Sequence, residues 1–211
     1  MHPIRNNLTS AMIFDLAGAH REHAYMILAG LVTPRPIALT TTIDSEGRIN
    51  AAPFSFFNVL GDSPPIVGIC PGNRPSGEPK DTVRNIRETG EFVVNLVDEA
   101  IASQMSACAA SLPHGENELI HAGLTAAPCE MVKAPRILEA PASLECRHHS
   151  TLEIGGNRLI IGEVLRVHVR EGIFETGTWL VKPGAYSPIG RMQSPNYYCR
   201  TTDMFEMRRP K

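Results

Sequence analysis

The fold is decided by residues 34–59, PRPIALTTTIDSEGRINAAPFSFFNV. Pro34 and Pro36 are separated by one residue, which forces an extended path and forbids a helix. Two runs rich in β-branched and aromatic residues follow, with the tight turn SEGR (45–48) between them. This order of strand, turn and strand predicts a β-hairpin over residues 37–59.

A short helix and a further strand come next along the chain. Asp81 suits a helix N-cap, Val83 and Ile86 lie three apart on one face, and Gly90 suits the position after the helix. The run GEFVVNLVD (90–98) then turns into a strand. The sequence thus predicts a helix of about two turns between two strands.

The remaining segments are mostly β-rich. Residues 66–70 predict a short buried strand, and residues 135–169 predict two or three strands with a hairpin turn at GGN (155–157). Residues 21–32, ending near a glycine, and residues 101–110 predict short helices. No βαβ rhythm repeats, so a mainly β barrel fits better than a doubly wound sheet. We expect one domain over 1–211.

Composition sets limits on function. The formal net charge of −2 gives no field that would attract nucleic acid or an anionic membrane. No apolar run approaches the ~20 residues of a membrane span, and the N-terminus lacks the zones of a secretory signal. Five widely spaced cysteines without a Cys-x-x-Cys pair argue against a disulfide framework. We therefore expect a cytoplasmic protein with no nucleic-acid or membrane partner.

The common catalytic motifs are missing from the sequence. There is no GxGxxG, no GxxxxGK[ST] and no GxSxG, so a dinucleotide fold, a P-loop and a nucleophile elbow have no support. His148 and His149 are adjacent on an expected strand and point to opposite faces, which makes them a poor pair of metal ligands. No catalytic residue and no metal site is predicted.

Two segments indicate a site for a planar ring and a phosphate. In residues 50–53 (NAAP) the small side chains let a flat ring approach the backbone, and Ser55 adds a hydroxyl. Lys80 and Thr82 flank the start of the helix, where unpaired N–H groups and a partial positive charge suit a phosphate. Flavin mononucleotide (FMN) needs both parts. Taken alone, the segments also fit a plain strand with an edge proline and an ordinary capped helix.

Several runs together resemble the flavin reductase-like, FMN-binding split-barrel family, most closely its flavoredoxin-like branch. The resemblance covers about residues 22–207, nearly the whole chain. The runs that carry it are PRPIALTTT (34–42) with Gly47, NAAPFSFFN (50–58), KDT (80–82) with Asn85-Ile86, TGEFVVNL (89–96), LECR (144–147), IGEV (161–164) and YSPIGR (186–191).

The resemblance implies a split β-barrel of Greek-key topology with a few peripheral helices, and a homodimer with FMN at or near the subunit interface. Strands 34–41 and 50–57 would line the flavin ring, and residues 80–82 would lie near the phosphate. Peptide N–H groups and Arg35 are the candidates for stabilising the reduced flavin. The tail around Tyr186 and Arg191 would close over the site or the partner, and FAD remains an alternative cofactor. The expected cofactor-binding residues are Arg35, Thr40, Thr41, Asn50, Ala51, Ala52, Pro53, Ser55, Phe56, Lys80, Asp81, Thr82 and Arg191.

One departure from the family pattern bears on the electron donor. Flavin reductases of two-component monooxygenases often carry Gly-Asp-His at the late hairpin, and that histidine is linked to reduced nicotinamide, whereas residues 155–157 here read Gly-Gly-Asn. Three functions stay open: a flavin reductase or related oxidoreductase using NADH or NADPH, a flavoredoxin-like electron carrier with a small-molecule or protein redox partner, and a binding module without flavin. Cys70 is expected to be structural rather than a redox thiol. The role of His114, which lies in a glycine-rich loop, stays open, and Trp179 is expected in the core or at a dimer contact.

Overall fold

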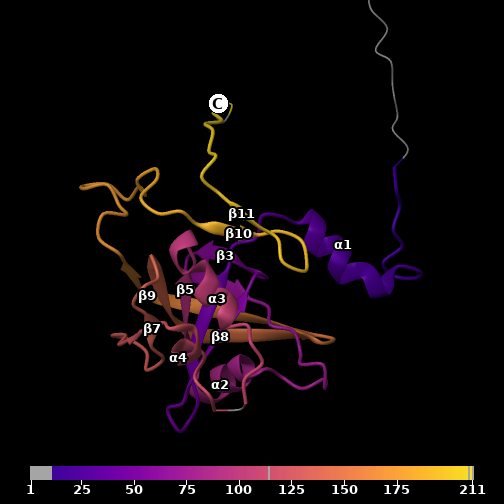
Figure 1. Cartoon of the computed structure of the whole chain (residues 1–211), viewed down its shortest axis with the longest axis horizontal. Helices are drawn as coiled ribbons and strands as arrows, with labels where there is room; N and C mark the ends of the chain where they lie inside the picture. The colour runs from indigo at the N-terminus through magenta and orange to yellow at the C-terminus, as the bar shows by residue number, and fades with distance from the viewer. Residues whose placement is uncertain (1–10, 114, 209, 211) are drawn as a thin grey trace, which may run out of the picture.

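The computed structural model describes residues 11–113, 115–208 and 210, and it is built mainly of β-strands (Figure 1). The mainly β class with few helices is therefore confirmed. The strands are β1 (Ala38–Ile43), β2 (Ile49–Phe54), β3 (Phe57–Asp62), β4 (Pro65–Ile69), β5 (Glu91–Leu96), β6 (Ala126–Ala127), β7 (Arg136–Ile137), β8 (Ala142–Ile154), β9 (Asn157–Val169), β10 (Ile189–Arg191) and β11 (Tyr198–Arg200). The α-helices are α1 (Ala24–Leu31), α2 (Asp81–Thr89), α3 (Ala102–Ala107) and α4 (Glu118–Ala122), and 3-10 turns cover Arg21–His23 and Glu99–Ile101.

The main sheet is antiparallel and has the strand order β2-β1-β5-β8-β9-β4-β3. The predicted first hairpin is present, because β1 pairs with β2 from Ala38↔Phe54 to Ile43↔Ile49. β8 and β9 form a long second hairpin. Its turn places Gly155 at φ 57°, in the left-handed region that favours glycine.

The sheet curls into a split barrel. Its two edge strands, β2 and β3, are separated along the chain only by Ser55 and Phe56, so the two edges must meet at this corner. No ladder joins β2 to β3 within the described parts of the chain, and the barrel is open there. The sequence predicts a single strand through residues 49–59. The structure breaks it because the Phe56 carbonyl accepts from the Cys70 backbone N–H (2.8 Å) and β3 pairs with β4.

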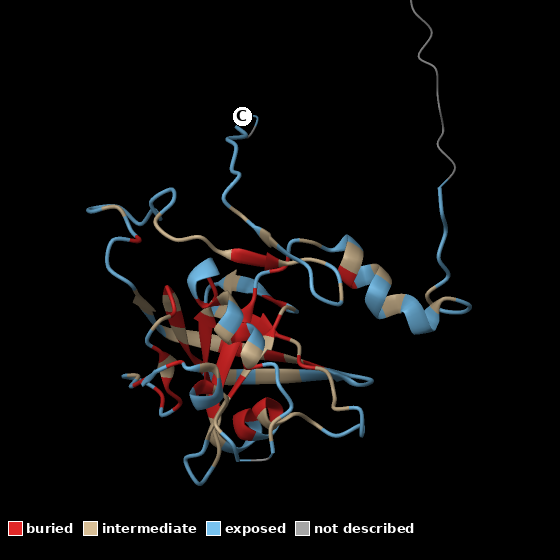
Figure 2. Ribbon diagram, viewed as in Figure 1, coloured by how far each residue is buried: buried red, intermediate tan, exposed pale blue. Residues whose placement is uncertain are grey.

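Alternate residues of β1 contribute to two cores on opposite faces of the sheet. Ala38 belongs to the cluster inside the barrel, where Val83 and Ile86 of α2 are also buried (Figure 2). Leu39 belongs to the cluster on the other face, which α3 and α4 cover. Packing on both faces thus fixes the beginning of α2 and the segment between α3 and α4 next to the edge strand β2.

α1 and the C-terminal strands lie outside the barrel (Figure 1). The short ladder of β10 and β11 is joined to the chain before β1 by the bridge Arg35↔Arg191. The segment between β9 and β10 leaves Trp179 95% exposed, so a core position for this residue is excluded. Among the described helices, none is long and apolar enough to cross a membrane.

Element boundaries differ from the expectations in small ways. α1 continues one residue past Gly30, and the N-cap of α2 is Lys80 rather than Asp81. Gly90 follows α2 in the left-handed conformation, as predicted (φ 73°). α4, β10 and β11 were not predicted, because elements of three to five residues are too short to show a hydrophobic period.

Candidate functional site

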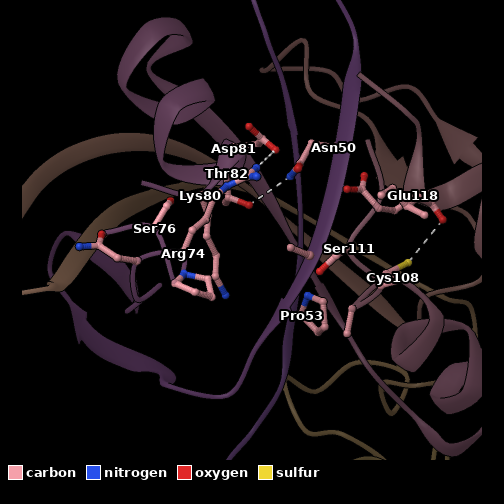
Figure 3. A pocket seen from close by; sticks show the side chains of 16 residues that line it. Asn50, Pro53, Arg74, Ser76, Lys80, Asp81, Thr82, Cys108, Ser111 and Glu118 are labelled. Carbon is pink, nitrogen blue, oxygen red and sulfur yellow. Dashed lines mark hydrogen bonds and ion pairs between the residues drawn. The ribbon is translucent and has the colours of Figure 1, made fainter. Parts of the chain in front are cut away.

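A cleft of about 550 Å³ opens where α2 begins (Figure 3). It is bordered by the edge strand β2, by the loop 73–76 with residues 80–82, and by the segment 108–112. In Figure 3 the labelled side chains of all three surround one hollow. The volume falls in the range of small-molecule sites, roughly 300–1,000 Å³.

The N-terminus of α2 gives one wall of the cleft a positive character. Lys80 is the N-cap residue, and the first turn of a helix presents backbone N–H groups and the positive end of the helix dipole. Lys80 Nζ lies 5.5 Å from the centroid of the Phe54 ring and forms no ion pair with any described residue. The Asp81 carboxylate is ion-paired with both Arg74 and Arg84, so its charge is compensated. This wall therefore favours an anion.

The strand β2 presents small side chains and backbone to the same cleft. Asn50, Ala52 and Pro53 line it, and Asn50 Nδ2 donates to Thr82 Oγ1 at 3.1 Å, which joins β2 to α2. Since β2 is an edge strand, one side of its backbone has no neighbouring strand. Ala52 projects only a methyl group and Pro53 has no N–H, so a flat ligand can approach this edge closely.

Glu118 is a partly buried carboxyl at this cleft. Its Oε2 accepts from the Ala51 backbone N–H at 2.9 Å, so the start of α4 caps the free edge of β2. Burial raises the pKa of Glu118, and the negative charge of Asp81 raises it further. Glu118 and the positive wall at Lys80 thus border one cavity, with Asn50 and Thr82 between them in Figure 3.

The structure brings together part of the expected cofactor site. Ser55 and Arg191 line a smaller lobe of about 210 Å³, which adjoins the cleft because both share Pro53 and Ala109. That these residues bind a cofactor stays a prediction. The expected residues that line the main cleft are Asn50, Ala52, Pro53, Lys80, Asp81 and Thr82.

Arg35 does not direct its guanidinium into the cleft. Its Nη1 donates to the carbonyls of Ala29 and Val32 at 2.5 and 2.6 Å, and its Nη2 donates to the carbonyl of Met192 at 2.7 Å. A longer contact of 3.5 Å joins Nε to Ser55 Oγ. The buried side chain therefore ties α1, the chain after β10 and the β2–β3 corner together. A contact between Arg35 and a flavin stays a prediction.

Four other expected residues also lie outside the main cleft. Thr40, Thr41 and Ala51 are fully buried, because β1 is covered by strands on both edges and Ala51 packs in the core beneath β2. The Phe56 ring packs against Tyr25, with 6.2 Å between centroids, at the β2–β3 corner. Strand neighbours alternate between faces, so a run of sequence cannot place every side chain on the ligand side.

The tip of the β8–β9 hairpin reaches the loop that borders the cleft. Gly72 and Asn157 form an isolated antiparallel bridge, and a Cβ on Gly156 would lie 3.6 Å from Asn73 Nδ2. Arg158 Nη1 also donates to Asn73 Oδ1. The turn in which the sequence lacks the expected histidine is therefore held against a residue that lines the cleft.

Sequence reasoning missed two parts of the site. Arg74 lies in a loop (71–80) that is rich in proline and glycine and directly precedes a helix, a combination that is typical of anion-binding loops. The segment 108–112 offered no such signal, because only the tertiary packing of α3 and α4 brings it to β2.

The cysteines are free, and most have thiols that resist ionisation. Burial raises the pKa of Cys108 and of Cys146 to about 12, and of Cys129 to about 11. Burial also raises the pKa of Cys70, which directly follows β4 and does not line the cleft. His114 lies outside the described residues.

A second polar cluster lies around Glu145, a fully buried residue of β8. Its carboxylate accepts from the backbone N–H groups of residues 130–132 at 2.6 to 3.2 Å and from His168 Nε2 at 2.5 Å. The thiol of Cys129 is near enough for the three side chains to enclose a cation. However, the carboxylate is already saturated by its own chain, so we interpret the cluster as an anchor for the turn at 130–132.

Comparison with known proteins identifies the family. The chain matches the flavin reductase like domain over residues 30–191. It is similar to nitrilotriacetate monooxygenase component B from Bacillus cereus, with 32% identity and a TM-score of 0.88 over 94% of this chain and 99% of that chain. It is similar to 2-nitrobenzoate 2-nitroreductase NbaA from Pseudomonas fluorescens, with 35% identity and a TM-score of 0.85 over 94% and 96%. Flavoredoxin of Desulfovibrio vulgaris (Miyazaki F) shares the fold, with 22% identity and a TM-score of 0.74 over 84% and 92%.

The protein therefore belongs to the flavin reductase-like family of split-barrel proteins, because the family match spans most of the chain. The fold and the family that the sequence predicts are confirmed. This membership makes the chain a flavin-related oxidoreductase in the broad sense.

Proposed function

We propose that the protein binds FMN in the cleft at the start of α2 and passes electrons from a reduced nicotinamide to an acceptor. One observation carries the proposal. A positive helix N-terminus with Lys80 and the small-residue edge of β2 border the same cleft, which offers an anion site and a planar-ring site together.

The positive wall fits the phosphate. Lys80 and the first turn of α2 would hold it, with Thr82 placed beside them by its hydrogen bond to Asn50. The ion pairs of Asp81 with Arg74 and Arg84 keep its carboxylate from repelling the phosphate.

The edge of β2 fits the ring. Ala52 and Pro53 would let the flat ring approach, and the backbone beside them would read its polar edge. Bound flavin supplies the redox chemistry, in which two electrons are taken from the donor and released to the acceptor. The residues of this chain would bind the flavin and orient it in the cleft.

A second candidate function is a flavoredoxin-like electron carrier without efficient use of nicotinamide. It is favoured by the Gly-Gly-Asn turn at 155–157, which lies at the loop 71–80 and carries no histidine there. A third candidate, a binding module without flavin, is disfavoured by the open cleft, which Lys80 lines without an ion pair to any described residue.

The test is the visible absorbance of the purified protein after addition of FMN or FAD, followed by anaerobic NADH or NADPH. Flavin bands that bleach support the nicotinamide-linked oxidoreductase. Bands that persist with both nicotinamides but bleach with a reduced protein partner support the electron carrier. Failure to bind either flavin at micromolar concentrations contradicts both and supports the third candidate.

We propose a cytoplasmic homodimer as the working unit. Exposed apolar side chains gather on two outlying segments, with Leu31 and Val32 at the end of α1 and Trp179 and Leu180 between β9 and β10. We expect light scattering to give twice the chain mass of 23.0 kDa, and Trp179→Ser with Leu180→Ser to shift the protein toward monomer. A wild-type protein that scatters as a single chain contradicts the proposal.

A further inference from the structure

The smaller lobe of the cleft is a separate cavity of about 210 Å³ beyond the waist formed by Pro53 and Ala109. It lies among α1, the end of β2, α3 and the β10–β11 ladder. Tyr25, Ser55 and Arg191 line it together with residues of α3. Such a cavity is too small for a dinucleotide and has room for a single substituted ring.

Arg191 supplies this lobe with an uncompensated positive charge. Its backbone is fixed by two hydrogen bonds with Arg35, at 2.8 and 3.0 Å, and its guanidinium carbon lies 4.7 Å from the centroid of the Tyr198 ring. The guanidinium donates to the carbonyl of Pro195 and forms no ion pair within the described ranges. Because an arginine has five N–H donors, most of the fork remains for a ligand.

The other arginines near the site are occupied by their own chain, and Arg35 already donates to three backbone carbonyls. Arg74 and Arg84 are paired with Asp81, and Arg200 on the neighbouring strand β11 is paired with Glu99 at 2.5 Å. Among the arginines that line the two described cavities, Arg191 is thus the one that is held in place and forms no ion pair with a described carboxylate. A carboxylate from a ligand would complete it, since bidentate pairing with a carboxylate is the geometry that arginine favours.

The walls of the lobe favour an aromatic body for this anion. Tyr25, Phe54 and Tyr198 contribute ring faces or edges, and Ser55 adds a hydroxyl at the waist toward the main cleft. Tyr25 is held by a contact between its hydroxyl and Ser194 Oγ at 3.3 Å. Aromatic walls gain from an offset or edge contact with a flat ligand.

We propose that this lobe is a second ligand subsite beside the ring site and that it binds a small aromatic carboxylate through Arg191. The position of this ligand beside a flavin ring rests on the proposed flavin function, because the ring site is placed at Pro53, which lines both cavities. The binding of the aromatic carboxylate itself rests on Arg191 and the aromatic walls alone.

Isothermal titration calorimetry on the full chain tests the proposal, with benzoate as the probe and benzamide as its neutral counterpart. We expect benzoate to bind with and without FMN and to bind at least about 10-fold more tightly than benzamide, since a charge-assisted pair contributes roughly 1.5–3 kcal/mol. Arg191→Gln should weaken benzoate by about 10-fold or more and leave benzamide unchanged. Arg191→Lys should keep part of the preference, because it keeps the charge.

Arg200→Gln is the matched control, since it removes a charge from the same ladder where that charge is already paired with Glu99. It should leave benzoate affinity unchanged. Benzoate binding that is absent in the wild type, equal to that of benzamide, unchanged in Arg191→Gln, or abolished by FMN occupancy overturns the proposal. If FMN does not bind but benzoate still binds through Arg191, the flavin function fails and the aromatic carboxylate site stands.

Discussion

The cleft at the start of α2 and the cluster around Glu145 are both polar regions of one curled sheet, but they use their polar groups in opposite ways. The Glu145 carboxylate is buried and accepts four groups of its own chain. At the cleft, Lys80 forms no ion pair in the described structure, and a cavity of about 550 Å³ lies beside it. A polar group that its own chain satisfies stabilises the fold, whereas one left over next to a cavity is available to a ligand.

The largest expected effect on stability is at the cluster around Glu145, where the polar groups are satisfied by their own chain. Glu145→Leu leaves the three backbone N–H groups of residues 130–132 and the His168 ring without their acceptor, so we expect a loss of about 3–5 kcal/mol in the free energy of unfolding. Urea unfolding measures it. Glu163→Gln, which breaks the exposed pair with Arg147, is the control and should cost less than about 1 kcal/mol. A loss below about 1 kcal/mol for Glu145→Leu would remove the contrast between the two regions.

Arg35 sharpens the comparison, because its donors are satisfied by its own chain although its position in the sequence suggests a contact with flavin. Arg35→Met removes the donor from three backbone carbonyls, and we expect a loss of about 3 kcal/mol in the free energy of unfolding. The absorbance spectrum of flavin bound to the folded variant should be unchanged. Unaltered stability together with a shifted flavin spectrum would return Arg35 to the ligand site.

Glu118 shares features of both regions. Its carboxylate accepts from the Ala51 backbone N–H, and it also borders the cleft. Burial raises its pKa above the unfolded value, so the folded state binds the proton more tightly, and stability falls as pH rises through the interval between the unfolded and folded pKa values. Glu118→Gln should therefore flatten the dependence of Tm on pH from below 4.5 toward neutrality. The exposed neighbour substitution Glu116→Gln is the control. A pH profile that Glu118→Gln leaves unchanged contradicts the buried position of this carboxyl.

The smallest effect on stability is expected at the open cleft. Lys80 lies over the Phe54 ring and has no charged partner in the part of the chain that is described. Lys80→Ala should therefore lower the free energy of unfolding by less than about 1 kcal/mol, the contribution of a partly exposed cation–π contact. A loss as large as that of Arg35→Met in the same urea experiment would show that contacts of Lys80 within its own chain stabilise the fold.

The comparison also explains what the sequence could predict. Strand hairpins and α2 follow from local patterns of β-branched residues, turns and caps, so they were predicted correctly. The wall at 80–82 was found because a helix start is a local feature. The burial of Thr40 and Thr41 and the position of Arg35 depend on strands and segments far along the chain. For the same reason, nothing local indicated that residues 108–112 would border the cleft.

The most direct measurement compares the affinities of FMN and riboflavin for the wild type and for Lys80→Ala by quenching of flavin fluorescence. If the phosphate lies at Lys80 and the start of α2, FMN should bind the wild type at least about 10-fold more tightly than riboflavin, since a charge-assisted contact contributes roughly 1.5–3 kcal/mol. Lys80→Ala should remove most of that difference while leaving riboflavin affinity unchanged. Equal affinities of FMN and riboflavin for the wild type would contradict the assignment of this cleft.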